Sequence, residues 1–221
     1  MRKSDVINQL SRKLGLKSYL EICTPTTGGR FAQIDSGQFA IKHRLIYRCV
    51  EDLSDKSDDT VSTSASFSYE IVRNRLLERM PGALYDVVFV DSFHTYEATM
   101  ADLFGAYALT KRGGLIVVHD CNPTDRALTS PDFKTGSWLG VTYEAFIDFV
   151  IARQDADWYT VDCDYGCGVL LKPTEGSKEQ DVLALEWFIA KLEGRTYEFL
   201  HDNRSTLLRL TSVERFIASV R

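Results

Sequence analysis

The sequence predicts an α/β fold built on a doubly wound, mostly parallel sheet. Residues 85–90 and 115–118 are short, almost wholly apolar runs rich in β-branched side chains. Such runs are typical of strands that are buried on both faces of a parallel sheet. Residues 95–109 lie between them and carry their apolar side chains on one helical face, so the three segments form a β-α-β unit.

A C-terminal hairpin adds an antiparallel strand to this sheet. Residues 157–163 and 166–172 are both strand-like, and only Asp164 and Tyr165 separate them. A connection this short can join only antiparallel neighbours. We therefore expect an antiparallel strand beside the parallel ones.

The segments before the β-α-β unit follow the same alternation. Ser4 can cap a helix that reaches Leu14, residues 19–22 and 44–50 are strand-like, and Pro81 stops a helix over 68–80. The polar segment 51–66 is rich in Ser, Asp and Thr, and it predicts a surface loop that could act as a lid.

The segments after the β-α-β unit are mainly helical. Helices are expected over 138–153, 178–192 and 204–220. The last carries an apolar stripe that either packs on its own domain or forms a homodimer face, and both readings stay open. We expect one domain, 1–221, with an N-terminal helix (1–15), an α/β core (15–172) and C-terminal helices (173–221).

Composition narrows the classes of partner. The 221 residues are 44% hydrophobic with a net charge of −5, and no basic cluster interleaves with aromatic residues, which argues against nucleic acid. No apolar run suits a signal peptide or a membrane span. Five cysteines without a CxxC pair indicate reduced thiols and a cytoplasmic location. Cys163 and Cys167 could be half a zinc site, although two core thiols in a hairpin fit better.

Polar side chains gather where the two strands of the β-α-β unit end. Asp91 and His94 follow the first strand, and His119 and Asp120 follow the second. Ligands bind at this edge of an open α/β sheet. Asp91, His119 and Asp120 could hold a divalent metal, and a histidine ligand favours Mn²⁺, Fe²⁺ or Zn²⁺ over Mg²⁺. His119 and Asp120 can ligate together only if the strand ends there, because successive strand residues point to opposite faces.

Asp91 and His94 are also the candidate catalytic residues. Asp91 could accept a proton, or it could merely cap the following helix. A histidine titrates near neutral pH, so His94 suits a general base, although a polar turn residue is an equal reading.

Three motifs in this order resemble class I S-adenosylmethionine-dependent methyltransferases. They are YLEI at 19–22, DVVFVDSFHTYE at 86–97 and KRGGLIVVHD at 111–120. Within that superfamily the chain is most similar to small bacterial enzymes that methylate sugars and other small molecules, often with a bound divalent metal. The resemblance covers roughly residues 15–172 and implies a Rossmann-like fold.

The resemblance also implies a cofactor site on the first loop. The usual loop is acidic-x-Gly-x-Gly-x-Gly, whereas here Cys23 replaces the first glycine and the glycines come late. Glu51 and Asp52 are candidates for the ribose hydroxyls, or else they are solvated loop charges. The cofactor-binding residues it implies are Glu21, Cys23, Thr24, Thr27, Gly28, Glu51, Asp52, Asp91 and Phe93.

By this resemblance the protein would transfer a methyl group from S-adenosylmethionine, with Mg²⁺ or Mn²⁺ as a second candidate cofactor. The acceptor would be a hydroxyl, or less readily an amine, of a small polar molecule such as a sugar, and Trp138 and Tyr143 could stack on it. One alternative is a non-catalytic Rossmann-like binding protein with a decayed cofactor loop. Another is a metal-dependent hydrolase, which His94, His119 and Asp120 would serve.

Overall fold

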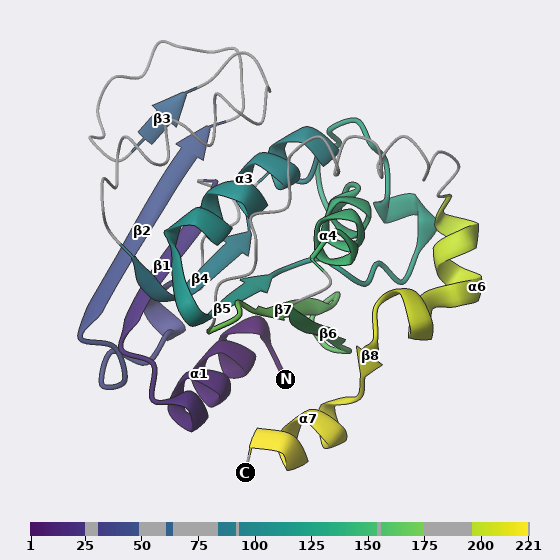
Figure 1. Cartoon of the computed structure of the whole chain (residues 1–221). Coiled ribbons are helices and arrows are strands. Elements are labelled where there is room, and N and C mark those ends of the chain that lie inside the picture. The colour runs from purple at the N-terminus through teal and green to yellow at the C-terminus, as the bar shows by residue number, and fades with distance from the viewer. Residues whose placement is uncertain are drawn as a thin grey trace.

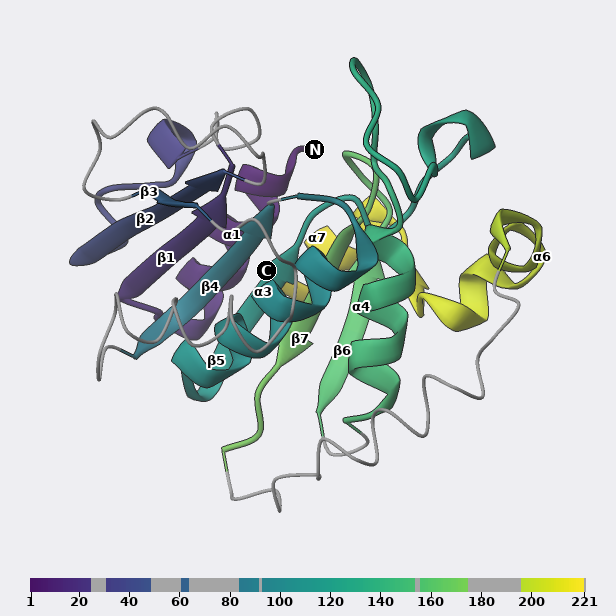
Figure 2. The ribbon, with the colours of Figure 1, turned by 90° about the horizontal axis from the view of Figure 1, so that it is seen from above.

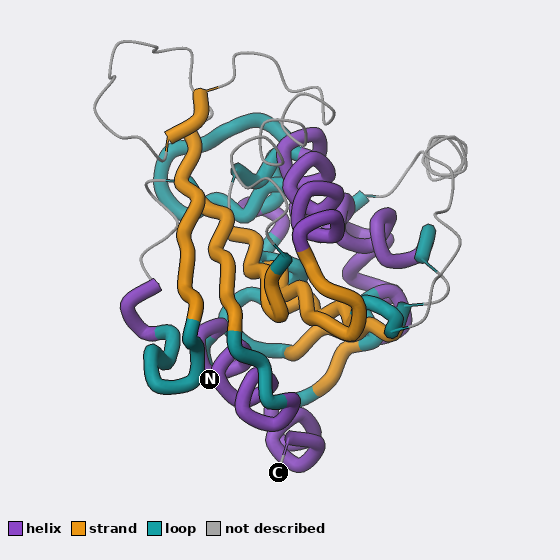
Figure 3. The backbone as a smooth tube through the Cα atoms, turned by 60° about the vertical axis from the view of Figure 1, so that its left-hand side comes forward, coloured by secondary structure: helices purple, strands orange, loops and turns teal. Residues whose placement is uncertain are grey.

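A computed structural model describes residues 1–24, 31–48, 61–63, 84–91, 93–153, 156–174 and 196–220. Within these ranges the strands form one sheet in the order β3-β2-β1-β4-β5-β7-β6-β8 (Figure 1). Helices lie on both faces of the sheet (Figure 3). The predicted Rossmann-like α/β fold with an antiparallel hairpin is therefore confirmed.

The first five strands are parallel, and the apolar runs of the sequence lie within them. The strands β1, β2 and β3 lie on one side of the sheet, and β4 and β5 lie beyond β1 on the other side. Strand β7 is antiparallel to both β5 and β6. The bounds are β1 Ser18–Cys23, β2 Ile41–Arg48, β3 Val61–Thr63, β4 Tyr85–Asp91, β5 Thr110–Val118, β6 Asp157–Val161, β7 Cys167–Leu171 and β8 Leu210–Thr211.

Helices pack on the two faces because each has an apolar side. Helices α3 and α4 cover one face, where Leu103 and Phe149 pack against Val88 and Ile116. Helices α1 and α7 cover the other face (Figure 2). The bounds are α1 Lys3–Leu14, α3 Tyr96–Leu109, α4 Thr142–Ile151, α6 Tyr197–Leu207 and α7 Val213–Val220, with 3-10 turns at Phe31–Gln33 and Arg126–Leu128.

The prediction of a single C-terminal helix over 204–220 is wrong. Arg209 has a φ of 44°, which ends α6 because the left-handed region cannot continue a helix. The next residues, Leu210–Thr211, pair with β6 as the short strand β8. Phe216 of α7 is fully buried in the core that α1 shares. The apolar stripe therefore serves packing within the domain, and a homodimer stays a prediction.

Other expected bounds need smaller corrections. Helix α4 begins at Thr142 rather than 138 because Gly140 turns the chain with a φ of 56°. Helix α1 begins at Lys3, one residue before the expected cap Ser4. The segment 51–66 is not entirely loop, since Val61–Thr63 is β3. The hairpin turns at Asp164 and Tyr165, both at positive φ, but its strands are shorter than expected, since β6 ends at Val161 and β7 begins at Cys167.

Some expectations lie outside the described residues. These are the helices over 68–80 and 178–192 and the greater part of the segment 51–66. In the ranges that the structure describes, no helix is both long enough and apolar enough to span a bilayer.

Candidate active site

The site lies at the carboxyl ends of β1, β4 and β5, beside the point where the order of the strands reverses. From β1 the chain proceeds outward to β2 and β3, and it then returns to form β4 on the opposite side of β1. Cys23 and Asp91 are the last residues of β1 and β4, and they are paired in register. This switch point at the carboxyl ends of parallel strands is where ligands bind in open α/β sheets.

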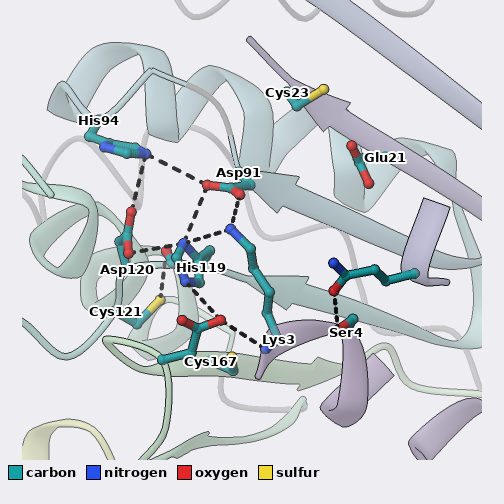
Figure 4. Close-up of polar contacts among 12 residues, drawn as sticks. Lys3, Ser4, Glu21, Cys23, Asp91, His94, His119, Asp120, Cys121 and Cys167 are labelled. Carbon is teal, nitrogen blue, oxygen red and sulfur yellow. Dashed lines mark hydrogen bonds and ion pairs between the residues drawn. The ribbon is translucent and has the colours of Figure 1, made fainter. Parts of the chain in front are cut away.

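Asp91 is the centre of a buried polar cluster at this point (Figure 4). Its Oδ2 accepts from the Lys3 ammonium, and its Oδ1 lies 3.4 Å from His119 Nδ1 and 3.8 Å from His94 Nε2. Burial raises the pKa of Asp91, but the positive neighbours outweigh it and hold the pKa well below its usual range. Helix capping is not its role, because Thr95 accepts from the N–H of Ala98.

His94 is held in place by a hydrogen bond at Nδ1. Its Nδ1 lies 2.9 Å from the carbonyl oxygen of Trp138, which can only accept, so Nδ1 carries the proton. Its Nε2 faces Asp120 Oδ2 at 3.3 Å. Burial lowers the pKa of His94, but Asp91 and Asp120 more than offset this and raise the pKa above its ordinary value.

The turn at Gly140 lies directly against His94. The N–H of Val141 donates to the carbonyl of His94 at 2.9 Å. A Cβ on Gly140 would come within 2.0 Å of that same oxygen, so only glycine fits. The tight turn explains how the segment before α4 holds His94 in place.

His119 and Asp120 both point into the cluster because β5 ends at Val118. Asp120 has a φ of 60°, a left-handed conformation that aspartate tolerates better than most residues. Its Oδ1 lies 2.9 Å from His119 Nδ1, and His119 Nε2 lies 3.7 Å from Asp164 Oδ2. Burial lowers the pKa of His119, but the charges of Asp120 and Asp91 raise it well above its usual value.

Lys3 is the residue of this site that sequence reasoning missed. It starts α1, its backbone N–H donates to Asp164 Oδ2 at 3.0 Å, and its Nζ lies 3.3 Å from His119 Nδ1. Its side chain is only 9% exposed. The available signal was helical spacing, since Lys3 stands on the same stripe as Val6, Ile7 and Leu10.

The loop after Asp120 is secured from the C-terminal part of the chain. Arg204 of α6 donates to Asn122 Oδ1 and, at 2.7 Å, to the carbonyl of Pro123. Asn122 in turn donates to Asp162 Oδ1 at 2.9 Å. The side of the site that follows β5 is therefore attached to both the hairpin and α6.

A model of a known protein family matches the part of the chain that carries most of this site. Residues 18–121 match the family model described as a methyltransferase domain, and this match spans β1 to the residue after Asp120. Over these residues, slightly less than half of the chain, the sequence is similar to methyltransferase domains. The predicted resemblance to S-adenosylmethionine-dependent methyltransferases is confirmed at that level.

None of the curated proteins matches the chain. Several solved structures share its fold at low identity. The O-methyltransferase TomG of Streptomyces achromogenes, solved with S-adenosylmethionine, is 16% identical with a TM-score of 0.48 and 77% and 79% of the two chains covered. An O-methyltransferase of Bacillus cereus, solved with S-adenosylhomocysteine, is 14% identical with a TM-score of 0.46 and 78% and 82% covered.

The fold brings some of the expected cofactor residues to the switch point. Cys23 and Thr24 are buried at the end of β1. Glu21 is buried deeper in the strand, where its carboxylate accepts from Tyr19 at 3.0 Å and pairs with Arg44 Nε at 3.1 Å. Thr27, Gly28, Glu51 and Asp52 lie outside the described residues.

Burial makes the thiols of Cys23 and Cys121 poor nucleophiles. Cys23 accepts from Arg44 Nε at 3.2 Å, and burial raises the pKa of its thiol to about 12. Cys23, Cys121, Cys163 and Cys167 are all free. In the part of the chain that the structure describes, neither Cys163 nor Cys167 joins a metal-competent group.

Aromatic side chains form one wall beside the domain's polar cluster. The rings of Phe93, Phe133 and Trp138 lie 5.2–5.7 Å apart, and Phe133 is 60% exposed. Phe93 therefore lies next to the polar cluster, and its expected contact with the cofactor stays a prediction. Tyr143 does not lie there, because it is buried in a separate core with Ile147 and Leu200.

The domain's fit to a divalent metal is incomplete. Among the described residues, donor atoms of Asp91, His94 and Asp120 lie within 4.8 Å of one another. The expected set had His119 in place of His94, and His119 is instead in contact with the carboxylates of Asp120 and Asp91. The Lys3 ammonium already binds Asp91. With Lys3 there, the cluster does not fit a metal ion.

Proposed function

We propose that this methyltransferase domain transfers a methyl group from S-adenosylmethionine to a hydroxyl of a small polar acceptor such as a sugar. The observation that supports this best is His94, which is buried at the sheet edge with Nδ1 donating to a carbonyl and Nε2 facing two carboxylates. This is the arrangement of a general base whose charged form is stabilised by its neighbours. An amine acceptor would have less need of such a base, so the presence of His94 favours a hydroxyl acceptor.

When bound, S-adenosylmethionine supplies a methyl group activated by its sulfonium charge. The methyl group would pass to the acceptor oxygen as its bond to sulfur breaks, with the electron pair of that bond kept by sulfur. The hydroxyl proton passes to His94 Nε2, and the carboxylates of Asp91 and Asp120 stabilise the imidazolium. General base catalysis of this kind typically contributes about 10²–10⁴-fold.

The switch point gives the cofactor its place. We assign Cys23 and Thr24 at the end of β1 to one side of the cofactor, and Asp91 and Phe93 after β4 to the other. Cys23 and Asp91 are paired in register as the last residues of β1 and β4, so the two sides meet at the same switch point. Glu21 supports this wall from inside the strand through its pair with Arg44.

The acceptor would lie against the aromatic wall of Phe93, Phe133 and Trp138. The exposed ring of Phe133 offers an apolar face on which the C–H side of a sugar ring can rest. The hydroxyls of such an acceptor would face His94 and the carboxylates. The free cysteines fit the reducing cytoplasm, where we place the protein.

The first test is titration calorimetry with S-adenosylmethionine and S-adenosylhomocysteine. We expect micromolar binding of both. Transfer of a labelled methyl group to a panel of sugars and sugar nucleotides then tests the acceptor class, with His94→Gln as the inactive control. Absence of binding by either ligand would overturn the proposal. Binding without transfer to any hydroxyl acceptor would favour the non-catalytic alternative.

A metal-dependent hydrolase is not supported by the geometry. The His-Asp pair of such hydrolases lies on a helix in an all-helical fold, whereas His119 and Asp120 follow the strand β5. Hydrolysis of a phosphoester panel by the same preparation provides the direct check, and we expect none.

A further inference from the structure

The buried ammonium of Lys3 is unusual in its position. Lysine is rarely buried unless it is paired, and here Nζ lies against Asp91 Oδ2 and 3.3 Å from His119 Nδ1 (Figure 4). It also lies 5.8 Å from the centre of the Phe89 ring. The side chain is therefore enclosed by the polar cluster rather than extended into solvent.

The backbone of Lys3 is held as firmly as its side chain. Its N–H donates to Asp164 Oδ2 at 3.0 Å, which binds the first turn of α1 to the β6–β7 hairpin. The apolar face of the same helix is buried by Val6, Ile7 and Leu10. Withdrawal of the ammonium therefore requires a change of rotamer in a closed space or a movement of α1.

Lys3 and a divalent ion would compete for the same carboxylate. The ion would bind carboxylate oxygens of Asp91 and Asp120 at about 2.0–2.6 Å. The ammonium already lies on one oxygen of Asp91. Two cations this close repel each other strongly where water is excluded, so the cluster accommodates one of them at a time.

We propose that Lys3 is the resident cation of this site. Its ammonium holds Asp91 where a divalent metal ion would otherwise bind, and it excludes that ion. It is a positioning residue, since its ammonium acts through Asp91. The protein would then bind no divalent ion at Asp91 while Lys3 is present, and loss of the ammonium would create a metal site from Asp91, His94 and Asp120.

The test is to titrate the wild-type chain, Lys3→Met and Lys3→Arg with Mn²⁺. Binding is measured from the electron paramagnetic resonance signal of the free ion. Methionine keeps the apolar stem and removes the charge, whereas arginine keeps the charge. We expect Lys3→Met to bind one Mn²⁺ at least about tenfold more tightly than the wild type and Lys3→Arg. Circular dichroism confirms that each variant is folded.

Saturable Mn²⁺ binding by the wild type with the same affinity as Lys3→Met would overturn the proposal. So would a folded Lys3→Met that gains no affinity. If Lys3→Met does not fold, acetylation of the native wild-type chain with acetic anhydride replaces it, read by peptide mass spectrometry. Lys3 should react far more slowly than the exposed Lys134 with and without Mn²⁺, and equal rates, or loss of protection with Mn²⁺, would refute the assignment. These readouts measure cation binding and burial, so they are independent of methyl transfer.

Discussion

The imidazole of His94 donates from Nδ1 to the backbone carbonyl of Trp138 over 2.9 Å, and this bond directs Nε2 toward Asp120. The two residues are separated by α3, β5 and the loop after Asp120. The orientation of the proposed base is therefore set by a backbone group, which side-chain substitution at Trp138 would not remove.

His94→Gln should abolish proton removal and leave the cofactor in place. We expect kcat to fall by roughly 10²–10⁴-fold, the usual contribution of a general base. The Kd for S-adenosylmethionine should change little, since Cys23, Thr24 and Asp91 are untouched. His201→Gln is the control, because His201 is exposed on α6. Equal kcat values for the two variants would rule out His94 as the base.

Gly140→Ala should distort the site as well as the fold. The new Cβ would lie 2.0 Å from the carbonyl oxygen of His94, and the φ of 56° is itself unfavourable for alanine. Gly136→Ala is a matched control, since Gly136 has a φ of 92° with nothing within 4 Å of a Cβ. Thermal unfolding and kcat are the measurements.

For the control we expect only the backbone strain, about 1 kcal/mol. For Gly140→Ala we expect roughly 2–4 kcal/mol, because steric overlap is added to the strain, together with a lower kcat. Identical losses at the two glycines would mean that the contact with His94 has no effect.

Asp86 should make the free energy of unfolding depend on pH in the acidic range. Its Oδ2 accepts from the backbone of Lys17 and Ser18, each at 2.8 Å, and its Oδ1 pairs with Lys111 at 2.8 Å. Burial raises the pKa of Asp86, but Lys111 and these donors outweigh it and lower the pKa. A carboxyl with a lowered pKa in the folded state stabilises the fold above its unfolded pKa of about 4, and it loses this contribution as pH falls through the folded value.

Asp86→Asn should therefore destabilise the protein by about 1–2 kcal/mol at pH 7. The difference from wild type should shrink as the pH is lowered below about 4. Urea unfolding at a series of pH values measures it, with Asp132→Asn in an exposed loop as the control. A difference that stays constant over this pH range would show that the carboxylate charge is not responsible.

The pair of Glu21 and Arg44 should show strong coupling. Glu21 is fully buried and Arg44 is 28% exposed, so Arg44→Met leaves a carboxylate in the sheet without its cation. We expect a loss of about 3 kcal/mol for this variant. Glu21→Gln together with Arg44→Met should recover part of that loss, because the unpaired charge is gone. Additive effects in this double-mutant cycle would contradict the coupling.

Most of the central fold could be predicted because its signals are local. The apolar runs that became β4 and the inner part of β5, and the one-sided helix between them, needed no information from elsewhere in the chain. The turn at Asp164 and Tyr165 was equally local. The C-terminal helix was predicted wrongly because its apolar stripe continues through Arg209, where the pairing of β8 with β6 breaks the helix.

The site was predicted in part for the same reason. Asp91, His94, His119 and Asp120 follow strands that the pattern reveals, and the parallel sheet brings them together. Lys3 is 88 residues from Asp91, and a contact over that distance depends on how α1 packs. A lysine on the apolar stripe of a helix was its one trace in the sequence.

Two hydrogen bonds from Arg204 to Asn122 and Pro123 attach α6 to the loop after Asp120, so the loop depends on α6 when the protein is heated. This helix has only Leu200 fully buried, whereas nearly all of β4 and the inner part of β5 are buried. Segments with little buried apolar surface open at lower free energy than the core. Warming would therefore detach α6 and loosen the loop after Asp120 while the sheet is intact. The proposed methyl transfer would then be lost at a lower temperature than the β-sheet signal.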